Sequence, residues 1–179
     1  RADVIWSDAD TIRLKEHCSP EVAHAVDMAA ATGLRVSDLI RLEWSHVNED
    51  SIVISTGKSL HMRVAIIPLY GQLREILGRI PKAGPVILTN SRGIPWTRSG
   101  LATSFQKAKV AAKLHDDKHR FHDFRGTAAT KFYLAGLSFR VIAEILAWDE
   151  DRVEKIIRRY VGRSAATQAI IRQLDGTKE

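Results

Sequence analysis

The sequence holds little of several features that mark particular classes of protein. It contains one cysteine, Cys18, so no disulfide can form within the chain, which is typical of a reducing compartment. Its longest apolar runs are too short to cross a bilayer, and no basic segment followed by an apolar stretch and a small-residue cleavage site opens the chain. These features exclude a disulfide scaffold and favour a cytoplasmic protein with no membrane partner.

Basic residues are scarce in the first 50 positions, which carry 5 Lys or Arg against 10 Asp or Glu and therefore a balance of −5. The whole chain of 179 residues has a net charge of +6, which leaves +11 for residues 51–179. This asymmetry indicates a polyanionic partner that meets the later part of the chain. Charge alone leaves open the alternative of a basic surface that binds nothing.

Helical patterns dominate the chain, whose length and 45% apolar content suffice for one well-formed core. Ser7 and Ser19 are typical helix caps, and Gly33 is a typical helix end. Ser37 and Ser99 are predicted to cap later helices in the same way. The predicted helices cover residues 8–17, 20–32, 37–42, 69–79, 99–114, 122–134, 138–146, 150–160 and about 164–179.

Two β-branched runs, 52–54 and 64–68, flank a connection that contains Gly57, and they predict an antiparallel hairpin with Lys58 in or beside its tip. Residues 86–88 are expected to add one short strand. Because no repeat or linker interrupts the chain, we expect a single domain over residues 1–179. Its predicted class is α+β, predominantly α-helical, with a small antiparallel β-sheet. The tail helix either closes its own core or docks onto a neighbouring protomer.

His122 and Arg125 stand three residues apart at the start of a predicted helix, a spacing that puts both side chains on one helical face. A guanidinium offers a planar fork of donors that fits phosphate oxygens, and an imidazole can exchange a proton near neutral pH. The pair taken by itself is equally typical of a helix-capping histidine beside a salt-bridged arginine.

Companion motifs make the pair specific. TGLRVSDLIRL surrounds Arg35, Lys58 follows on the hairpin, HDFRG contains the pair, Trp148 ends an apolar helix, and RRYV contains Tyr160. In this order, the set resembles the catalytic domain of the tyrosine recombinases, the phage integrase family. The resemblance covers roughly residues 8–175 and includes all six positions that matter.

The resemblance implies an enzyme that cleaves and rejoins DNA strands without a metal or any other cofactor. Tyr160 would attack phosphorus and become linked to the 3′ phosphate, so that the phosphodiester energy is kept while a 5′ hydroxyl leaves. Arg35 and Arg125 would bind the non-bridging oxygens, and His122 would assist proton transfer with the tyrosine. Lys58 would protonate the departing oxygen.

Trp148 stands where many members of the family have histidine. Its indole N–H can donate a hydrogen bond but cannot carry a proton, so we assign it binding and packing. Asp38 matches an acidic position that orients the first arginine or its helix. Tyr160 follows Trp148 by 12 residues, about one helical turn more than the commonest family spacing, and we expect its phenol still to face the pocket.

The other aromatic residues and histidines fit structural roles better. Tyr133 lies in an apolar helix, and Tyr70 begins a helix and lacks a basic neighbourhood in the sequence. A loop with His115 and His119 beside His122 offers no cysteine or regular spacing to fix a metal. The other tryptophans, Trp6, Trp44 and Trp96, are expected to pack in the core or on the surface. For Trp96, which stands between Pro95 and Arg98, an approach to DNA is the alternative.

The sequence therefore predicts the catalytic domain of a site-specific DNA recombinase or integrase from a phage, prophage or other mobile element, acting in the cytoplasm of a bacterial or phage-infected cell in association with the nucleoid. Its expected partners are double-stranded recombination sites, copies of itself (a tetramer on paired sites and a monomer when free) and accessory DNA-bending proteins. The family usually carries a separate DNA-binding domain before the catalytic one, and we expect this sequence to be a fragment of such a protein rather than the product of an unusually short element. The alternatives are a type IB topoisomerase-like relaxing activity and a catalytically silent DNA-binding protein. The candidate phosphate contacts are Arg98, Lys107, Arg120, Lys131, Arg158 and Arg159.

Overall fold

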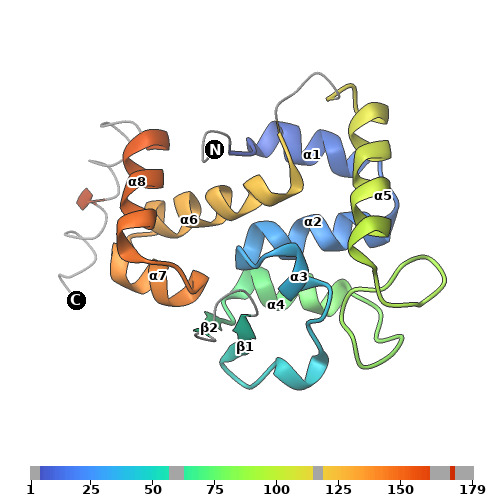
Figure 1. The fold of residues 1–179 in the computed structure, drawn as a ribbon, viewed down its shortest axis with the longest axis horizontal. Coiled ribbons are helices and arrows are strands. Elements are labelled where there is room, and N and C mark those ends of the chain that lie inside the picture. Colours follow the sequence, from blue (N-terminus) through green and yellow to red (C-terminus); the bar gives the residue numbers. More distant parts are fainter. Residues whose placement is uncertain (1–4, 57–62, 115–118, 162–169, 172–179) are drawn as a thin grey trace.

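The computed structural model describes residues 5–56, 63–114, 119–161 and 170–171, in which helices predominate and two strands form one antiparallel sheet (Figure 1). This confirms the predicted fold class. The α-helices are α1 Asp8–Glu16, α2 Pro20–Thr32, α3 Val36–Leu39, α4 Gly71–Arg79, α5 Arg98–Ala111, α6 Phe124–Leu134, α7 Phe139–Leu146 and α8 Glu150–Tyr160. Two 3₁₀ turns, η1 Trp44–His46 and η2 Phe121–Asp123, and the strands β1 Ser51–Thr56 and β2 Arg63–Pro68 complete the elements.

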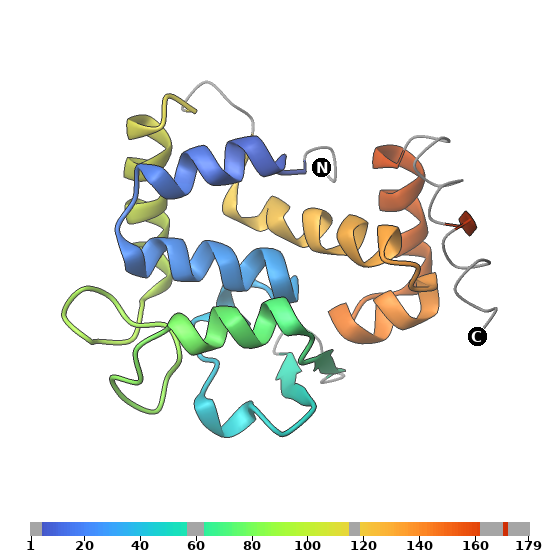
Figure 2. The same ribbon diagram turned by 180° about the vertical axis from the view of Figure 1, so that it is seen from behind.

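The central element is α2, which lies between α6 and α4 in both ribbon views (Figures 1 and 2). Its small side chains explain this position, because Ala25, Ala29 and Ala31 are buried and let neighbouring helices approach closely. The helix ends as predicted at Gly33, whose φ of 63° is left-handed. The C-terminal end of α2 thereby turns toward α6 and α7.

The N-terminal segment is tied to α6 through Trp6, which is 2% exposed. Its ring stacks on Phe124 with centroids 4.8 Å apart, and its backbone N–H donates to Thr127 Oγ1 at 2.8 Å. The expectation that Trp6 packs in the core is confirmed. Ser7 then caps α1 as predicted, with its Oγ accepting from the Asp10 N–H at 3.1 Å.

The hairpin pairs Ile52 with Ile67 and Ile54 with Ala65, which confirms the predicted antiparallel arrangement. These four side chains point into the core, while Val64 on the opposite face is 49% exposed. Strand β2 also packs against α7, so the sheet joins the two parts of the chain that carry the predicted site residues. Lys58 lies outside the described residues.

Several predicted element boundaries are wrong. Helix α3 begins after Arg35 and α5 begins after Thr97, whose Oγ1 accepts from the Gly100 N–H at 3.1 Å; the predicted caps Ser37 and Ser99 therefore lie inside their helices. The extended backbone of the preceding residue, rather than the serine, starts each helix.

The strand expected at residues 86–88 is reduced to an isolated bridge between Val86 and Glu43, because Pro85 beside it has no N–H to extend a ladder. The tail helix expected at 164–179 falls outside the described residues except at 170–171. In the part of the chain that the structure describes, no helix is both long and apolar enough to cross a membrane.

Candidate phosphate-binding site

Arg125 is the centre of the candidate site. It is the second residue of α6 and is 3% exposed, an unusual degree of burial for a charged side chain. Its guanidinium donates to the Gly33 carbonyl at 2.6 Å and to the Leu146 carbonyl at 3.4 Å. Its Nε–H has no hydrogen-bond partner among the described residues. Two carbonyls thus position the guanidinium without satisfying all of its donors or neutralising its charge.

Gly33 makes this geometry possible. A Cβ at this position would lie 2.3 Å from Leu146 Cδ2 and 3.1 Å from Ala128 Cβ, so a larger residue would push α2 away from α6 and α7. Its left-handed backbone is also a conformation that glycine adopts without strain. The glycine in TGLR therefore brings the carbonyl that holds Arg125 to the site.

Arg35 joins the site from the N-cap of α3. Its Nη1 lies 3.9 Å from Oδ2 of Asp38, a carboxylate that is 1% exposed and that also accepts from Arg41 at 3.0 Å. Asp38 therefore lies beside the first arginine, where the resemblance placed it. Because one buried carboxylate is shared by two arginines, the cluster around it keeps an excess of positive charge.

Trp148 forms one wall of the site and is 6% exposed. The guanidinium carbons of two arginines lie over its ring, Arg125 at 4.7 Å and Arg152 at 4.6 Å from the centroid. The indole N–H has no hydrogen-bond partner among the described residues. Like the Nε–H of Arg125, it is a buried donor without a described acceptor.

Arg152 is the residue of this cluster that the sequence reasoning missed. It lies in the first turn of α8, four residues after Trp148. A spacing of four residues brings side chains together on a helix, so the WDEDR segment carried a usable signal. That signal was weak, because Trp148 lies before the helix begins.

His122 is not on the same helix as Arg125, contrary to the prediction. It lies in η2, where Asp123 Oδ2 accepts from the Arg120 N–H at 2.7 Å and closes a 3₁₀ turn before α6. Although His122 keeps part of its surface exposed, its burial and, after that, Arg125 and Arg152 lower its pKa below the ordinary value of 6.5. The imidazole is therefore neutral at pH 7 and can accept a proton.

The arginines repel one another. Burial first, and then Arg35 and Arg152, lower the pKa of Arg125 to about 9, against the opposing effect of Asp38. Burial and Arg35 likewise lower the pKa of Arg152, against Asp149. Planar guanidiniums that crowd together with too few carboxylates form a site for an oxyanion, above all phosphate.

Tyr160 lies at the opposite end of α8 from Trp148, as the last residue of the helix. The helix is continuous, so its rise of about 1.5 Å per residue separates the backbones of Arg152 and Tyr160 by about 12 Å along the axis. Tyr160 is partly buried on the same stripe as Val153 and Ile156, and α8 packs against α6. Its predicted role as nucleophile stays a prediction.

The two other tyrosines have structural environments. The Tyr70 hydroxyl donates to the Ala31 carbonyl at 3.0 Å, and burial raises its pKa to about 12. Its neighbourhood is nevertheless basic, contrary to the expectation from sequence, because Lys131 Nζ lies 5.5 Å from the ring centroid. Tyr133 stacks on Phe139 with centroids 5.4 Å apart.

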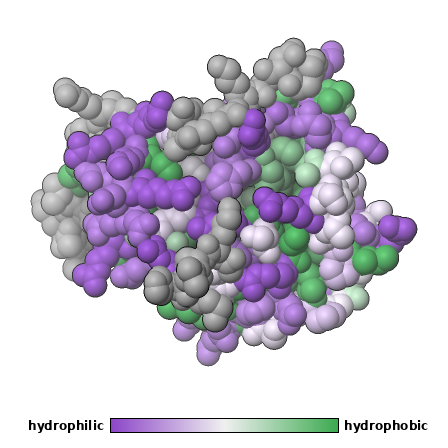
Figure 3. All heavy atoms as spheres, in the orientation of Figure 1, coloured by the Kyte–Doolittle hydropathy of each residue, from purple (hydrophilic) through white to green (hydrophobic). Residues whose placement is uncertain are grey.

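The six predicted phosphate contacts are spread over α5, α6, α8 and the start of η2. Figure 3 shows hydrophilic side chains gathered over α7 and α8. Lys131 donates to the Gln72 side chain, and Arg158 pairs with Glu154 at 2.6 Å. The other four side chains are exposed to solvent: Arg98, Lys107, Arg120 and Arg159. Because the six come from elements spread over the fold, the structure does not bring them into one cluster.

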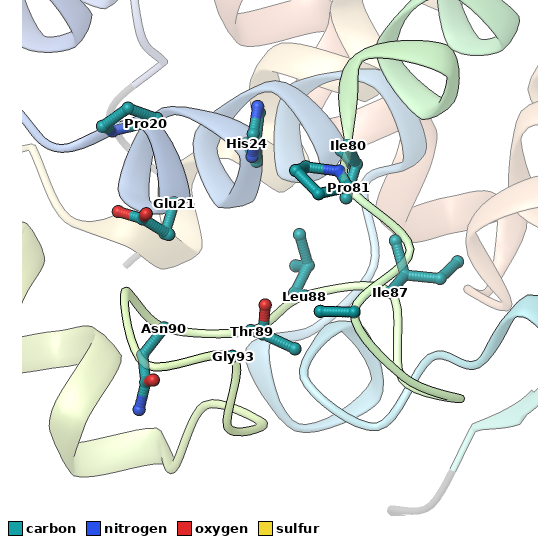
Figure 4. A pocket seen from close by; sticks show the side chains of 11 residues that line it. Pro20, Glu21, His24, Ile80, Pro81, Ile87, Leu88, Thr89, Asn90 and Gly93 are labelled. Carbon is teal, nitrogen blue, oxygen red and sulfur yellow. The ribbon is translucent and has the colours of Figure 1, made fainter.

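A separate hollow of about 220 Å³ has a different chemistry (Figure 4). Glu21 and His24 of α2 face the loop that contains Asn90, and no lysine or arginine lines the hollow. It therefore lacks the cations that a phosphate site needs. Among the described residues, no group of three or more His, Cys, Asp or Glu is arranged to hold a metal ion.

Comparison with known proteins identifies the class to which this fold and site belong. The sequence pattern of the phage integrase family matches residues 9–165, so the chain belongs to the phage integrase family. The integrase of Salmonella phage P22 is 28% identical over 162 residues, which cover 83% of this chain and 41% of that protein. The chain thus spans about two-fifths of the length of the curated relatives that it matches.

Solved structures share the fold. The lambda integrase catalytic core superposes with a TM-score of 0.68 at 21% identity, covering 82% of this chain and 91% of that one. A lambda integrase tetramer bound to a Holliday junction gives a TM-score of 0.67 at 19% identity and covers 82% of this chain and 47% of that one. The family and the fold are therefore established together.

Proposed function

We propose that the chain is the catalytic part of a site-specific DNA recombinase, which cleaves and rejoins strands through a 3′-phosphotyrosyl intermediate. The observation that carries this proposal is the cluster of Arg35, Arg125 and Trp148, in which buried donors lack described acceptors beside an excess of positive charge. A phosphodiester supplies both the acceptors and the charge that the cluster lacks. Membership in the phage integrase family supports the same reaction.

The cluster would act on the transition state. Arg35 and Arg125 would bind the two non-bridging oxygens and stabilise the charge that grows as phosphorus becomes five-coordinate. Because the Gly33 and Leu146 carbonyls already hold Arg125, this guanidinium needs little reorganisation during the reaction.

Proton transfers accompany the strand exchange. His122, neutral at pH 7, would accept the phenol proton as Tyr160 attacks phosphorus. The attack forms the Tyr160–phosphorus bond and breaks the bond to the 5′ oxygen, which Lys58 would protonate. Rejoining reverses the sequence when a 5′ hydroxyl attacks the phosphotyrosine.

The proposed partners are double-stranded recombination sites and further copies of the chain, because exchanging strands requires one nucleophile for each strand cut. The lambda integrase tetramer on a Holliday junction, which shares this fold, supports such an assembly. Accessory DNA-bending proteins, action at the nucleoid and origin in a mobile element belong to the same proposal. The single catalytic domain over residues 1–179 is proposed as well.

The experiment uses nicked suicide duplexes whose sequence is first selected from a random pool by binding to the chain. In such a duplex the strand beyond the nick diffuses away after cleavage, so the covalent adduct accumulates. We expect an adduct with the unsubstituted chain and none with Tyr160→Phe. Tyr133→Phe is the matched control, because this ring stacks on Phe139 away from the cluster.

Adduct formation by Tyr160→Phe, or its absence from a chain that binds the duplex, would overturn the proposal. Relaxation of supercoiled DNA without paired sites would instead favour a topoisomerase.

A further inference from the structure

Arg152 occupies a position that the stability of its own helix does not explain. The N-terminal end of a helix carries a partial positive charge that disfavours cations, and Arg152 lies in the first turn of α8. Glu150 and Asp151 in the same turn suit that end of the helix. The arginine is therefore placed where helix electrostatics oppose it.

The neighbours of Arg152 are mainly cationic. In addition to the effect of burial, Arg35 lies close enough to lower the pKa of Arg152, and Arg152 in turn lowers the pKa of Arg125 and of His122. Asp149 is the nearby acid, but it pairs with Arg63 at 2.7 Å and its side chain is 72% exposed. Among the described residues, no carboxylate lies within ion-pair distance of the Arg152 guanidinium.

Stacking on Trp148 does not account for the arrangement either. A cation over an aromatic ring at an exposed site stabilises a fold only weakly. Here two guanidiniums share one ring, at 4.7 Å and 4.6 Å from its centroid, so part of that gain is lost to repulsion between Arg125 and Arg152. An anion bound between them would turn the repulsion into attraction for a common ligand.

We propose that Arg152 is a third phosphate-binding arginine, which contacts a non-bridging oxygen of the phosphodiester bound by Arg35 and Arg125. The inference rests on the proposed function, since it assigns a further residue to the same site. Arg152 comes from α8, the helix that also carries Tyr160. Binding of the phosphate by Arg152 therefore couples the position of α8 to the presence of DNA.

The test compares Arg152→Met with Arg140→Met on the full 179-residue chain. Methionine keeps an apolar chain that can pack on Trp148 and removes only the charged fork. Arg140 is a matched control because it is an arginine of the adjacent helix α7, with a side chain 81% exposed and paired with Glu144 at 3.4 Å. Thermal denaturation checks that both variants fold, and Arg152→Lys, which restores a charge without the fork, is made in parallel.

Rates of adduct formation are measured on the selected suicide duplex with either an ordinary or a methylphosphonate group at the cleaved position. The methyl group replaces a non-bridging oxygen and removes the negative charge of the phosphate. We expect Arg152→Met to slow adduct formation about tenfold or more on the ordinary phosphate, as the loss of a charge-assisted hydrogen bond requires. We expect this deficit to shrink severalfold on the methylphosphonate and Arg152→Lys to recover part of the rate.

The outcomes separate the two proposals. If the unsubstituted chain forms no adduct, the proposed function fails, and this inference fails with it. If the unsubstituted chain forms adduct and Arg152→Met reacts as fast as Arg140→Met, the function stands and the inference is overturned. A deficit of equal size on both substrates also overturns it, because a residue that only supports the fold would not respond to the charge of the phosphate.

Discussion

Two buried cations of this protein, Lys109 and Arg125, have almost the same exposure and very different surroundings. Lys109 in α5 is 4% exposed, and its Nζ donates to the His119 carbonyl at 2.5 Å, where it ties the helix to the segment before η2. Arg125 is 3% exposed, keeps an Nε–H without a described partner, and lies among other arginines. Burial alone therefore does not mark a binding residue.

The difference lies in what each cation still needs. Lys109 links α5 to the segment before η2, so its replacement should mainly lower the free energy of unfolding. Arg125 is held by two backbone carbonyls but lies beside the cations Arg35 and Arg152, so its replacement should mainly weaken the binding of an anion. Four predictions test this distinction, beginning with the largest expected effect.

Arg125→Met is expected to slow adduct formation on a suicide duplex by about 100- to 1000-fold, because the transition state loses a preorganised charged donor. Lys109→Met should change that rate by less than about threefold and lower the free energy of unfolding by about 1–3 kcal/mol, since the His119 carbonyl loses its donor. Adduct rates and urea denaturation of both variants measure the split. Equal losses of rate would remove the distinction between the two cations.

Gly33→Ala is expected to lower the free energy of unfolding by about 2–5 kcal/mol, combining left-handed strain with the clash against Leu146. Adduct formation should fall as well, because the carbonyl that holds Arg125 moves. Gly78→Ala is the matched control: no atom lies within 4 Å of the added Cβ, and alanine in α4 should stabilise by up to about 1 kcal/mol. Urea denaturation gives both values, and an unchanged free energy of unfolding for Gly33→Ala would contradict the close approach of Gly33 to Leu146.

Trp148→Phe keeps an aromatic ring beside the arginines but removes the indole N–H, and it should slow adduct formation about tenfold. Trp96→Phe is the comparison, because the Trp96 N–H is also buried without a described partner yet none of the arginines of the cluster lies over its ring. We expect Trp96→Phe to react at the normal rate. A similar loss in both variants would mean that unpartnered donors do not by themselves identify the site.

The smallest effect concerns His122, whose pKa is lowered by burial and by Arg125, Arg152 and Arg35, against Asp123. Because the lowered pKa keeps the imidazole neutral, adduct formation should stay constant from pH 8 to about 6.5 and fall only below that. Because the pKa of His122 is lower in the folded protein than in the unfolded chain, the unfolded chain binds the proton more readily. The contribution of His122 to stability is therefore fully present above pH 6.5 and is lost as the pH falls. NMR titration should show the His122 pKa rising toward 6.5 in Arg152→Met, and no movement would place Arg152 too far away to act.

Part of the fold could be predicted because local chemistry decides it. Ser7 and Gly33 act as helix boundaries through their own hydrogen bonds and backbone freedom, and the hairpin follows from β-branched residues around a glycine. Ser37 and Ser99 are not caps, contrary to the prediction, because α3 starts after the extended backbone of Arg35 and α5 after that of Thr97. His122 lies before α6 rather than inside it, contrary to the prediction, because the Asp123 side chain closes a 3₁₀ turn that competes with the α-helix.

The candidate site divides in the same way. The order of the motifs around Arg35, Arg125, Trp148 and Tyr160 led from sequence to a family that the comparisons confirm. The sequence did not reveal Arg152, because its closeness to Arg35 and Arg125 depends on the packing of α8 beside α6 and α7. The end of α8 at Tyr160, by contrast, agrees with the helix predicted over residues 150–160.

The sequence by itself determined the helix-forming segments, the excess of positive charge after residue 50 and the ordered set of motifs, because each depends on residue identity and spacing. Only the tertiary structure decided which cations lose contact with water and what replaces it. The motif around Arg125 distinguishes it from Lys109 along the chain, but the sequence shows neither that both are buried nor what surrounds each of them. In the folded protein Lys109 donates to the His119 carbonyl, whereas Arg125 lies among other arginines. The two residues therefore differ, because the energy of a buried charge depends on its neighbours.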